Sequence, residues 1–224
     1  ETISSASLSP DGRTIALIAS GPGRTSRAYV LEAREGADIK VVASTSGRPE
    51  YLQRCDWVSA DRLACQIFGE QRYGDDVYGS SNVFSVSANG ADTKLLSQRR
   101  GANALSYDFR GGDVIDLLPG DEDAVLMTRS YVPEATAGSL IEKKLEGLGV
   151  DRIDTRSGSA KRIESPDKLA VDYISDGQGH VRIMALQENR TSGYAKGTYK
   201  FLYRPVGKSG WSNLSLYDTR DNSG

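Results

Sequence analysis

The chain has 224 residues and a formal net charge of −2 at pH 7, with 38% hydrophobic and 26% charged residues. These fractions are typical of a globular protein, and no stretch approaches the roughly 18 apolar residues that a membrane span needs. Positive and negative residues are interspersed, which leaves no basic patch for nucleic acid. We therefore expect neither a membrane nor a nucleic acid as a partner.

The first predicted element is a hairpin around Ser9-Pro10-Asp11-Gly12. Proline presets the first corner of a turn, aspartate accepts hydrogen bonds from the backbone ahead of it, and glycine tolerates a positive φ. Apolar stretches at residues 6–8 and 15–19 flank this turn and predict two strands, the second of them largely buried. Comparable turns between apolar stretches recur along the chain, centred on Asp61, Asp121 and Asp176.

A second kind of turn, which carries glycine, follows each of the aspartate turns. Its four occurrences are Glu35-Gly36, Asn89-Gly90, Ser157-Gly158 and Ser209-Gly210. The stretches beside these turns alternate between apolar and polar residues, as half-exposed strands do. The repeating unit is therefore strand, aspartate turn, buried strand, loop, strand, glycine turn, strand. It occurs four times, over approximately residues 3–45, 52–97, 113–165 and 169–218.

Repeated four-stranded antiparallel units of this length are typical of β-propeller blades. A β-sandwich also consists of short strands separated by turns, but its strands do not recur in groups of four. The predicted fold is therefore all-β, a propeller with about four blades in this chain. A sandwich is the alternative.

Two insertions interrupt the regular pattern. Residues 69–81 are polar, and we expect them to form a long hairpin loop in the second unit. Residues 131–149 contain Ser139-Leu140-Ile141-Glu142, in which the serine can cap a helix while Glu142 reaches back to the cap. This capping box predicts one short helix over residues 140–146, closed by Gly147.

The two cysteines, Cys55 and Cys65, lie in neighbouring predicted strands joined by a short turn. A hairpin with a two-residue loop would point them to opposite faces, because side chains alternate along a strand. A one-residue bulge would instead place them opposite each other and permit a disulfide. Two buried free thiols are favoured over the disulfide. The cysteines leave the compartment undecided, and a periplasmic or secreted location is favoured over a cytoplasmic one.

Three stretches carry a resemblance to a known family. The stretch from Ile3 to Gly12, which ends in the Ser-Pro-Asp-Gly turn, resembles the repeat of TolB-type propellers and the first blade of bacterial prolyl oligopeptidase-family propellers. Cys55-Asp56-Trp57-Val58, followed by Asp61-Arg62-Leu63, resembles the second-blade hairpin of these peptidases. Gly149-Val150-Asp151-Arg152-Ile153-Asp154-Thr155 is similar to a strand of their third blade. The family includes dipeptidyl and acylaminoacyl peptidases.

The resemblance implies a propeller of seven or eight blades that precedes an α/β-hydrolase domain with a Ser-Asp-His triad. This chain has about four units and no catalytic domain. We therefore expect the N-terminal portion of such a propeller, which gates the access of short peptides to the peptidase's own C-terminal hydrolase domain. The alternative is a TolB-like module that binds a protein partner and has no enzymatic role.

No catalytic apparatus is expected within the chain itself. The hydrolase nucleophile motif Gly-x-Ser-x-Gly is absent from the sequence. His180 is the one histidine, and we expect it at the surface beside a turn, since a triad needs three groups in mutual reach. One histidine and two cysteines do not make a zinc set, and Asp121-Glu122-Asp123 at a turn is expected to be solvated. No metal or other cofactor is predicted.

Glu142 and Glu146 are the candidate substrate-binding residues, because they share one face of the predicted helix. Two carboxylates held together can bind a free α-ammonium group. The resemblance implies such a role, since dipeptidyl peptidases use a Glu pair on a short propeller helix, although that pair is adjacent in sequence. A solvated acidic face is the alternative. Basic residues that can bind a peptide carboxylate or form ion pairs between blades are Arg99, Arg100 and Arg110.

The terminal blades of an incomplete ring carry faces that neighbouring blades would normally bury. Exposed apolar faces of this kind promote association. We therefore expect self-association through the first and last blades.

Overall fold

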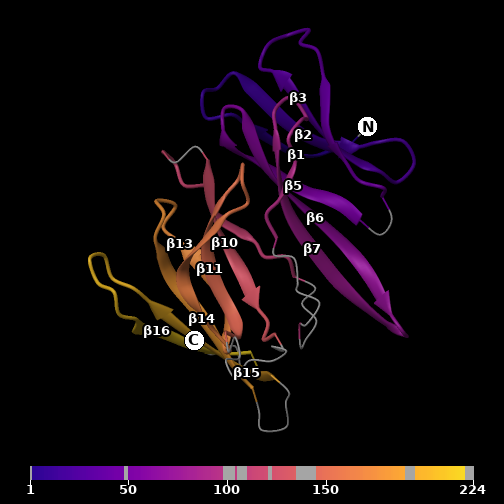
Figure 1. Ribbon diagram of the computed structural model, residues 1–224. Coiled ribbons are helices and arrows are strands. Elements are labelled where there is room, and N and C mark those ends of the chain that lie inside the picture. The colour runs from indigo at the N-terminus through magenta and orange to yellow at the C-terminus, as the bar shows by residue number, and fades with distance from the viewer. Residues whose placement is uncertain are drawn as a thin grey trace.

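The computed structural model describes residues 2–47, 50–97, 104, 110–120, 123–134, 145–189 and 195–219. Within these residues, sixteen strands form four separate sheets of four strands each (Figure 1). In every sheet the strands follow chain order, and each strand runs antiparallel to its neighbours. We call the sheets blades one to four.

Blades one and two contain the N-terminal half of the strands. Blade one consists of β1 (Ile3–Leu8), β2 (Thr14–Ser20), β3 (Ser26–Glu32) and β4 (Lys40–Ser44). Blade two consists of β5 (Glu50–Ser59), β6 (Arg62–Tyr73), β7 (Asp76–Ser87) and β8 (Lys94–Leu95).

Blades three and four repeat this plan. Blade three consists of β9 (Val114–Asp116), β10 (Ala124–Tyr131), β11 (Gly147–Asp154) and β12 (Ala160–Asp167). Blade four consists of β13 (Ala170–Ser175), β14 (Val181–Asn189), β15 (Ala195–Tyr203) and β16 (Ser212–Asp218). The all-β prediction and the grouping of strands in fours are confirmed.

The turn between β1 and β2 shows why Ser-Pro-Asp-Gly makes a corner. Ser9 Oγ donates to Asp11 Oδ1 over 2.6 Å, and the same oxygen accepts the backbone N–H of Arg13 over 3.1 Å. Gly12 supplies a φ of 73°, in the left-handed region that glycine tolerates best. The Ser9 and Arg13 hydrogen bonds hold the pKa of Asp11 below its ordinary value. Blade two repeats the device, since Ser59 Oγ donates to Asp61 over 2.6 Å.

Three hydrophobic cores join the blades, one between each consecutive pair. The first core contains Ile18 and Val30 of blade one with Trp57 and Leu63 of blade two. The second joins blades two and three, and the third joins blades three and four. Because each sheet buries side chains against the next one along the chain, the four sheets are successive propeller blades.

Alternation along the second strand of a blade separates its two faces. In β6, Leu63 and Cys65 face blade one, whereas Ala64 lies in the core shared with blade three. In β10, Met127 faces blade two and Leu126 faces blade four. We call the face toward the preceding blade the back face and the face toward the following blade the front face.

Cys55 and Cys65 form a disulfide, so the expectation of two free thiols is wrong. The register of β5 against β6 is irregular between Trp57 and Ser59, next to the turn. This irregularity shifts the ladder, as a bulge does, so Cys55 stands directly opposite Cys65 with their Cα atoms 4.0 Å apart. Both side chains lie in the core between blades one and two.

Removing this disulfide with a Cys55→Ala/Cys65→Ala double variant is expected to lower the free energy of unfolding by about 2–3 kcal/mol, the chain-entropy value for a loop of about ten residues. Urea unfolding with and without a reducing agent measures the effect. Reduction should shift the midpoint of the wild type and leave that of the double variant unchanged. Equal midpoints for oxidised and reduced wild-type protein would show that the cross-link contributes nothing.

The first insertion is a paired ribbon rather than a loop. β6 and β7 continue their ladder without a break from Arg62 opposite Ser87 to Tyr73 opposite Asp76. Gly74, with a φ of 64°, closes the ribbon. Strand-forming residues such as Phe68 and Val77 extend the pairing beyond the rest of the blade. The expected loop rested on the polarity of residues 69–81 alone, and polarity does not exclude a paired strand.

The helix predicted over residues 140–146 falls mostly outside the described residues. Its last two residues, Leu145 and Glu146, are described and are not helical, and Gly147 begins β11. The described part of the chain contains no helix long and apolar enough to cross a membrane.

Candidate functional site

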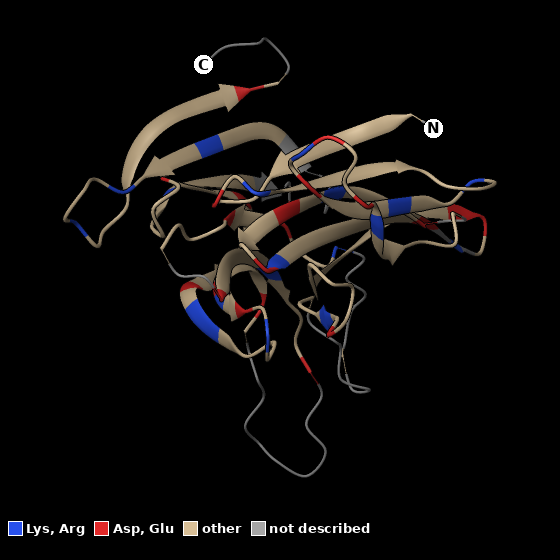
Figure 2. Ribbon diagram, turned by 90° about the horizontal axis from the view of Figure 1, so that it is seen from above, with Lys and Arg blue, Asp and Glu red and all other residues tan. Residues whose placement is uncertain are grey.

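The two ends of the blades differ. One end, the turn end, carries the short connections between the first and second and between the third and fourth strands of each blade. Turns of neighbouring blades meet there, since Arg156 Nη2 lies 3.1 Å from Asp61 and the Gly179 N–H donates to Asp116 over 2.8 Å. The opposite end, the loop end, carries the β6–β7 ribbon and the connections between blades (Figure 1). Figure 2 shows acidic and basic residues mixed over the blades.

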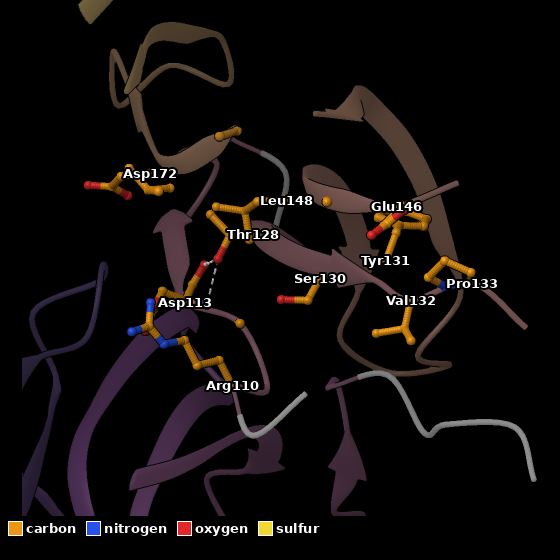
Figure 3. Close-up of a pocket in the computed structure, with 14 residues that line it drawn as sticks. Arg110, Asp113, Thr128, Ser130, Tyr131, Val132, Pro133, Glu146, Leu148 and Asp172 are labelled. Carbon is orange, nitrogen blue, oxygen red and sulfur yellow. Dashed lines mark hydrogen bonds between the residues drawn. The ribbon is translucent and has the colours of Figure 1, made fainter. Parts of the chain in front are cut away.

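A cavity of about 350 Å³ lies at the loop end between blades three and four. Its walls come from the segment before β9, the end of β10, the start of β11 and the start of β13. Figure 3 shows Arg110 and Asp113 on one side, Tyr131 and Glu146 on the other, and Ser130 between them.

The segment that leads into blade three passes close to the backbone of β10 at Gly112. Gly112 has a φ of 90°, and a Cβ atom on it would lie 2.1 Å from the Thr128 carbonyl oxygen. This close approach lets the Asp113 N–H donate to Thr128 Oγ1 over 2.9 Å. Gln66 of blade two donates to Asp113 Oδ1 over 2.5 Å. Blade three therefore holds the Asp113 backbone, and Gln66 of blade two holds its carboxylate at the cavity wall.

A buried charged network supports the other wall. Tyr131 Oη donates to Asp151 Oδ1 over 2.6 Å, and Arg129 Nη1 donates to Asp151 Oδ2 over 2.9 Å. Arg129 also donates to the Leu96 carbonyl of blade two over 3.2 Å. Burial raises the pKa of Tyr131, and its hydrogen bond to Asp151 raises it further. Tyr131 therefore stays protonated at neutral pH and is fixed at the rim of the cavity.

Of the two candidate substrate-binding residues, the structure places one. Glu146 lines the loop-end cavity and forms an ion pair with Lys168. Glu142 lies outside the described residues, as do Arg99 and Arg100, whereas Arg110 lines the same cavity as Glu146.

The cavity combines acidic groups with an apolar wall. Asp113 and Glu146 contribute two carboxyl groups and Arg110 one guanidinium group, whereas the Asp172 carboxylate accepts the Tyr173 N–H over 2.8 Å. The apolar wall is formed by Val132, Pro133, Leu148 and Val171. The carboxyl groups are spread around the cavity, and no three His, Cys, Asp or Glu side chains of the described residues gather as a metal site would require. The arrangement suits an organic cation with a small apolar part.

Sequence reasoning missed Asp113 and Asp172. Each is a single aspartate near the beginning of the first strand of its blade, and no motif surrounds either of them. The one available signal is the strand order. The first strands of consecutive blades begin at the same end of a propeller, so residues near the start of these strands lie at the same end.

His180 lies at the turn end, away from this cavity. Its side chain is 63% exposed, and its Nδ1 atom is 3.2 Å from Asp176 Oδ2. The prediction that His180 is a surface residue beside a turn is confirmed.

Asp176 carries a pH-dependent contribution to stability. Burial raises its pKa, but hydrogen bonds from Arg182 and from the backbones of Gln178 and His180 lower it more, to about 2. Because the folded-state pKa lies below the ordinary value of 3.8, ionised Asp176 stabilises the fold above about pH 4, and this contribution disappears as the pH falls toward about 2.

An Asp176→Asn variant should therefore be less stable than the wild type at about pH 5, and the difference should shrink as the pH falls to about 2. Chemical unfolding at each pH measures it. Asp38→Asn, at an exposed position of blade one, serves as the control. A difference that is constant across this range would contradict the assigned role of the Asp176 charge.

No family model matches the chain, and no curated protein matches it. Among solved structures, it is similar to TolB from Acinetobacter baumannii, with 15% identity, a TM-score of 0.46 and coverage of 97% of this chain and 44% of that one. The β-propeller domain of the Trilobed protease from Pyrococcus furiosus matches with 12% identity, a TM-score of 0.47 and coverage of 95% and 56%. A puromycin-hydrolyzing peptidase from Mycobacterium tuberculosis matches with 16% identity, a TM-score of 0.35 and coverage of 91% and 34%.

The chain thus spans 44%, 56% and 34% of the lengths of these three structures. Of the three, the Trilobed protease structure is described as a β-propeller domain. The four antiparallel sheets and their three shared cores make this chain a β-propeller module.

Proposed function

We propose that this chain is the N-terminal portion of the propeller of a prolyl oligopeptidase-type serine peptidase, and that it gates the access of short peptides to a catalytic domain outside this chain. The loop-end cavity is the observation that supports this role. The stretches that resemble the peptidase family support the assignment to a peptidase, since they fall in blades one, two and three.

The cavity has the size and lining of a site for the end of a peptide. Its volume of about 350 Å³ is near the lower limit of small-molecule sites, about 300–1,000 Å³. The carboxyl groups of Asp113 and Glu146 favour a ligand with a free α-ammonium group, which carboxylates bind through charge-assisted hydrogen bonds. The apolar wall at Val132 and Leu148 accommodates a small side chain beside it.

The role assigned to the propeller is steric and electrostatic, with no covalent step. Peptides too large for the opening are excluded, and the acidic wall orients a short peptide by its amino terminus. The Cys55–Cys65 disulfide supports a periplasmic or secreted location, because disulfides persist in oxidising compartments.

A protein-binding role of the TolB type is the second candidate, and the β6–β7 ribbon favours it. Val77 is 55% exposed on the ribbon and Tyr51 is 46% exposed beside its base. Tyr51 also contacts Phe68, with ring centroids 5.5 Å apart. Exposed apolar and aromatic side chains of this kind are typical of protein contact surfaces.

The test is activity of the polypeptide encoded by the complete gene. A fluorophosphonate reagent should label that polypeptide at a serine outside residues 1–224 and should leave this chain unlabelled. A complete gene product that neither reacts with the reagent nor cleaves peptides would contradict the peptidase assignment and favour the binding module.

The cavity is tested separately in the same full-length protein. Glu146→Gln and Asp113→Asn should raise KM about tenfold or more for peptides with a free amino terminus, the effect of losing a charged hydrogen bond. Amino-terminally blocked peptides should show no change. Glu32→Gln in blade one, whose carboxylate pairs with Arg34 at the surface, is the matched control. Equal effects on free and blocked peptides would exclude recognition of the ammonium group.

A further inference from the structure

A second cavity, of about 850 Å³, lies at the turn end between blades three and four. Its walls come from Ile163 and Glu164 of β12, from the β13–β14 turn with the start of β14, and from the β15–β16 turn. The volume falls within the range of small-molecule sites, about 300–1,000 Å³. The two blades that form the cavity share a core, so their relative position is set by packing within the chain.

Two arginines on neighbouring strands line this cavity. Arg204 stands opposite Arg182, since the Arg204 N–H donates to the Arg182 carbonyl over 2.8 Å. Alternation along the strands places both on the same face as Met184 and Leu202, which pack against blade three. Like charges opposite each other destabilise a sheet, so each of these arginines needs a counter-ion.

Arg204 is fully engaged by its surroundings. Its Nη1 and Nη2 atoms donate to the two carboxylate oxygens of Glu164 in blade three over 2.5 and 2.9 Å. Its guanidinium lies over the ring of Trp211, with Cζ 4.1 Å from the ring centroid. Both side chains of the ion pair are mostly buried, at 17% and 13% exposed. Arg204 and Glu164 therefore form a fixed wall of the cavity rather than its binding group.

Arg182 is engaged through one nitrogen only. Its Nε donates to Asp176 Oδ2 over 2.9 Å, whereas its Nη1 and Nη2 atoms have no hydrogen-bond partner among the described residues. Asp176 also accepts the backbone N–H of Gln178 over 2.9 Å and that of His180 over 3.1 Å. The Asp176 carboxylate is therefore satisfied, while the end of the Arg182 guanidinium stays open to the cavity.

Two further groups that can carry a positive charge line the same cavity. Lys208 is exposed in the β15–β16 turn and forms no ion pair with any described residue. The His180 side chain is 63% exposed. Because the two arginines balance Glu164 and Asp176, Lys208 leaves the lining with one net positive charge, and a protonated His180 adds another. The acidic groups are used within the structure, and the free donors are cationic.

We propose that this cavity binds the oxyanion group of a small organic molecule, either a phosphate monoester or a carboxylate. The two open Nη atoms of Arg182 form a planar fork that matches two oxygens of either group. Lys208 adds a charge at the rim, and Ile163 and Val206, which are 39% and 84% exposed, offer an apolar surface to the rest of the ligand. The site lies at the other end of the blades from the loop-end cavity and does not depend on the proposed peptidase role.

Calorimetric titration of this chain with phenyl phosphate and with benzoate tests the proposal, in a buffer free of phosphate and carboxylate. At least one of the two anions should bind saturably in the millimolar range or tighter, and the tighter of them identifies the group that the fork takes. Benzyl alcohol, a neutral probe of similar size, should not bind. Amide chemical shifts should change in the β13–β14 and β15–β16 turns. Binding of neither anion, or shift changes confined to other parts of the chain, would overturn the proposal.

Two substitutions then test the cationic groups one at a time. Arg182→Lys keeps the charge but removes the fork, and should raise the Kd of the bound anion about tenfold, the effect of losing a charged hydrogen bond. Because Arg182 also supports Asp176, the circular dichroism spectrum of this variant is compared with that of the wild type. Lys208→Met alters an exposed side chain without such a contact, and should raise the Kd about threefold, as for an exposed ion pair.

Lys40→Met is the matched control, because it removes the same charge from an exposed position of blade one. It should leave the Kd unchanged. An equal rise in Kd for Lys40→Met and Lys208→Met would show that only the overall charge of the chain attracts the anion. A Kd that neither Arg182→Lys nor Lys208→Met changes would place the anion elsewhere. Either result would overturn the assigned site.

Discussion

Replacing Asp151 with alanine is expected to lower the free energy of unfolding by about 3–5 kcal/mol, the cost of breaking a buried ion pair. The Asp151 side chain is 3% exposed and accepts hydrogen bonds from both Arg129 and Tyr131. Its removal leaves the Arg129 guanidinium, which is 14% exposed, without its counter-ion. Denaturant unfolding monitored by circular dichroism measures the loss.

Two further variants identify the cause of this loss. Asp151→Leu combined with Arg129→Met removes both charges and should recover much of the stability, because a well-packed apolar pair often replaces a buried ion pair without loss. Glu32→Ala removes the exposed carboxylate that pairs with Arg34, and should cost about 0–1 kcal/mol. Equal costs for Asp151→Ala and Glu32→Ala would show that burial of the network contributes nothing.

Replacing Trp57 with alanine is expected to lower the free energy of unfolding by about 3–5 kcal/mol, the range for large aromatic residues in a core. Trp57 is 4% exposed and belongs to the core between blades one and two. Its Nε1–H donates to the Ser7 carbonyl of blade one over 3.3 Å. The substitution therefore opens a cavity between two blades and leaves a carbonyl without its partner.

Tyr51→Ala is the matched control, because Tyr51 lies in the same strand and is 46% exposed. Its removal should cost about 1 kcal/mol or less. Amide exchange in the Trp57 variant should increase in blades one and two more than in blade four. Uniform acceleration in all blades would indicate that the joint between blades one and two is not a separate contact.

The grouping of strands was predictable because its signals are local. Ser9-Pro10-Asp11-Gly12 fixes a turn through hydrogen bonds made within five residues, and the structure contains those bonds. Each aspartate corner separates a shorter strand from a buried one, so four corners predict four blades. The propeller follows from repetition of a local rule.

The features that sequence reasoning missed depend on register or on distant contacts. The Cys55–Cys65 disulfide follows from one irregular position near Ser59, which shifts the pairing so that the cysteines stand opposite each other. The loop-end cavity brings Asp113, Glu146 and Asp172 from three separate segments to one place. A shift in register leaves no motif in the sequence. The cavity leaves none either, since each of its acidic residues is by itself an ordinary loop or strand residue.

The protein has two methionines, and their methyl groups provide the most direct test of the order of the blades. Met127 lies in the core between blades two and three, and Met184 lies in the core between blades three and four. In a methionine- and branched-methyl-labelled sample, NOEs should connect the Met127 methyl to blade-two methyls such as Val83 or Leu96. The Met184 methyl should contact blade-three methyls such as Leu126 or Val150. NOEs from Met184 to blade two, or none from Met127 to it, would contradict the succession of four blades that share three cores.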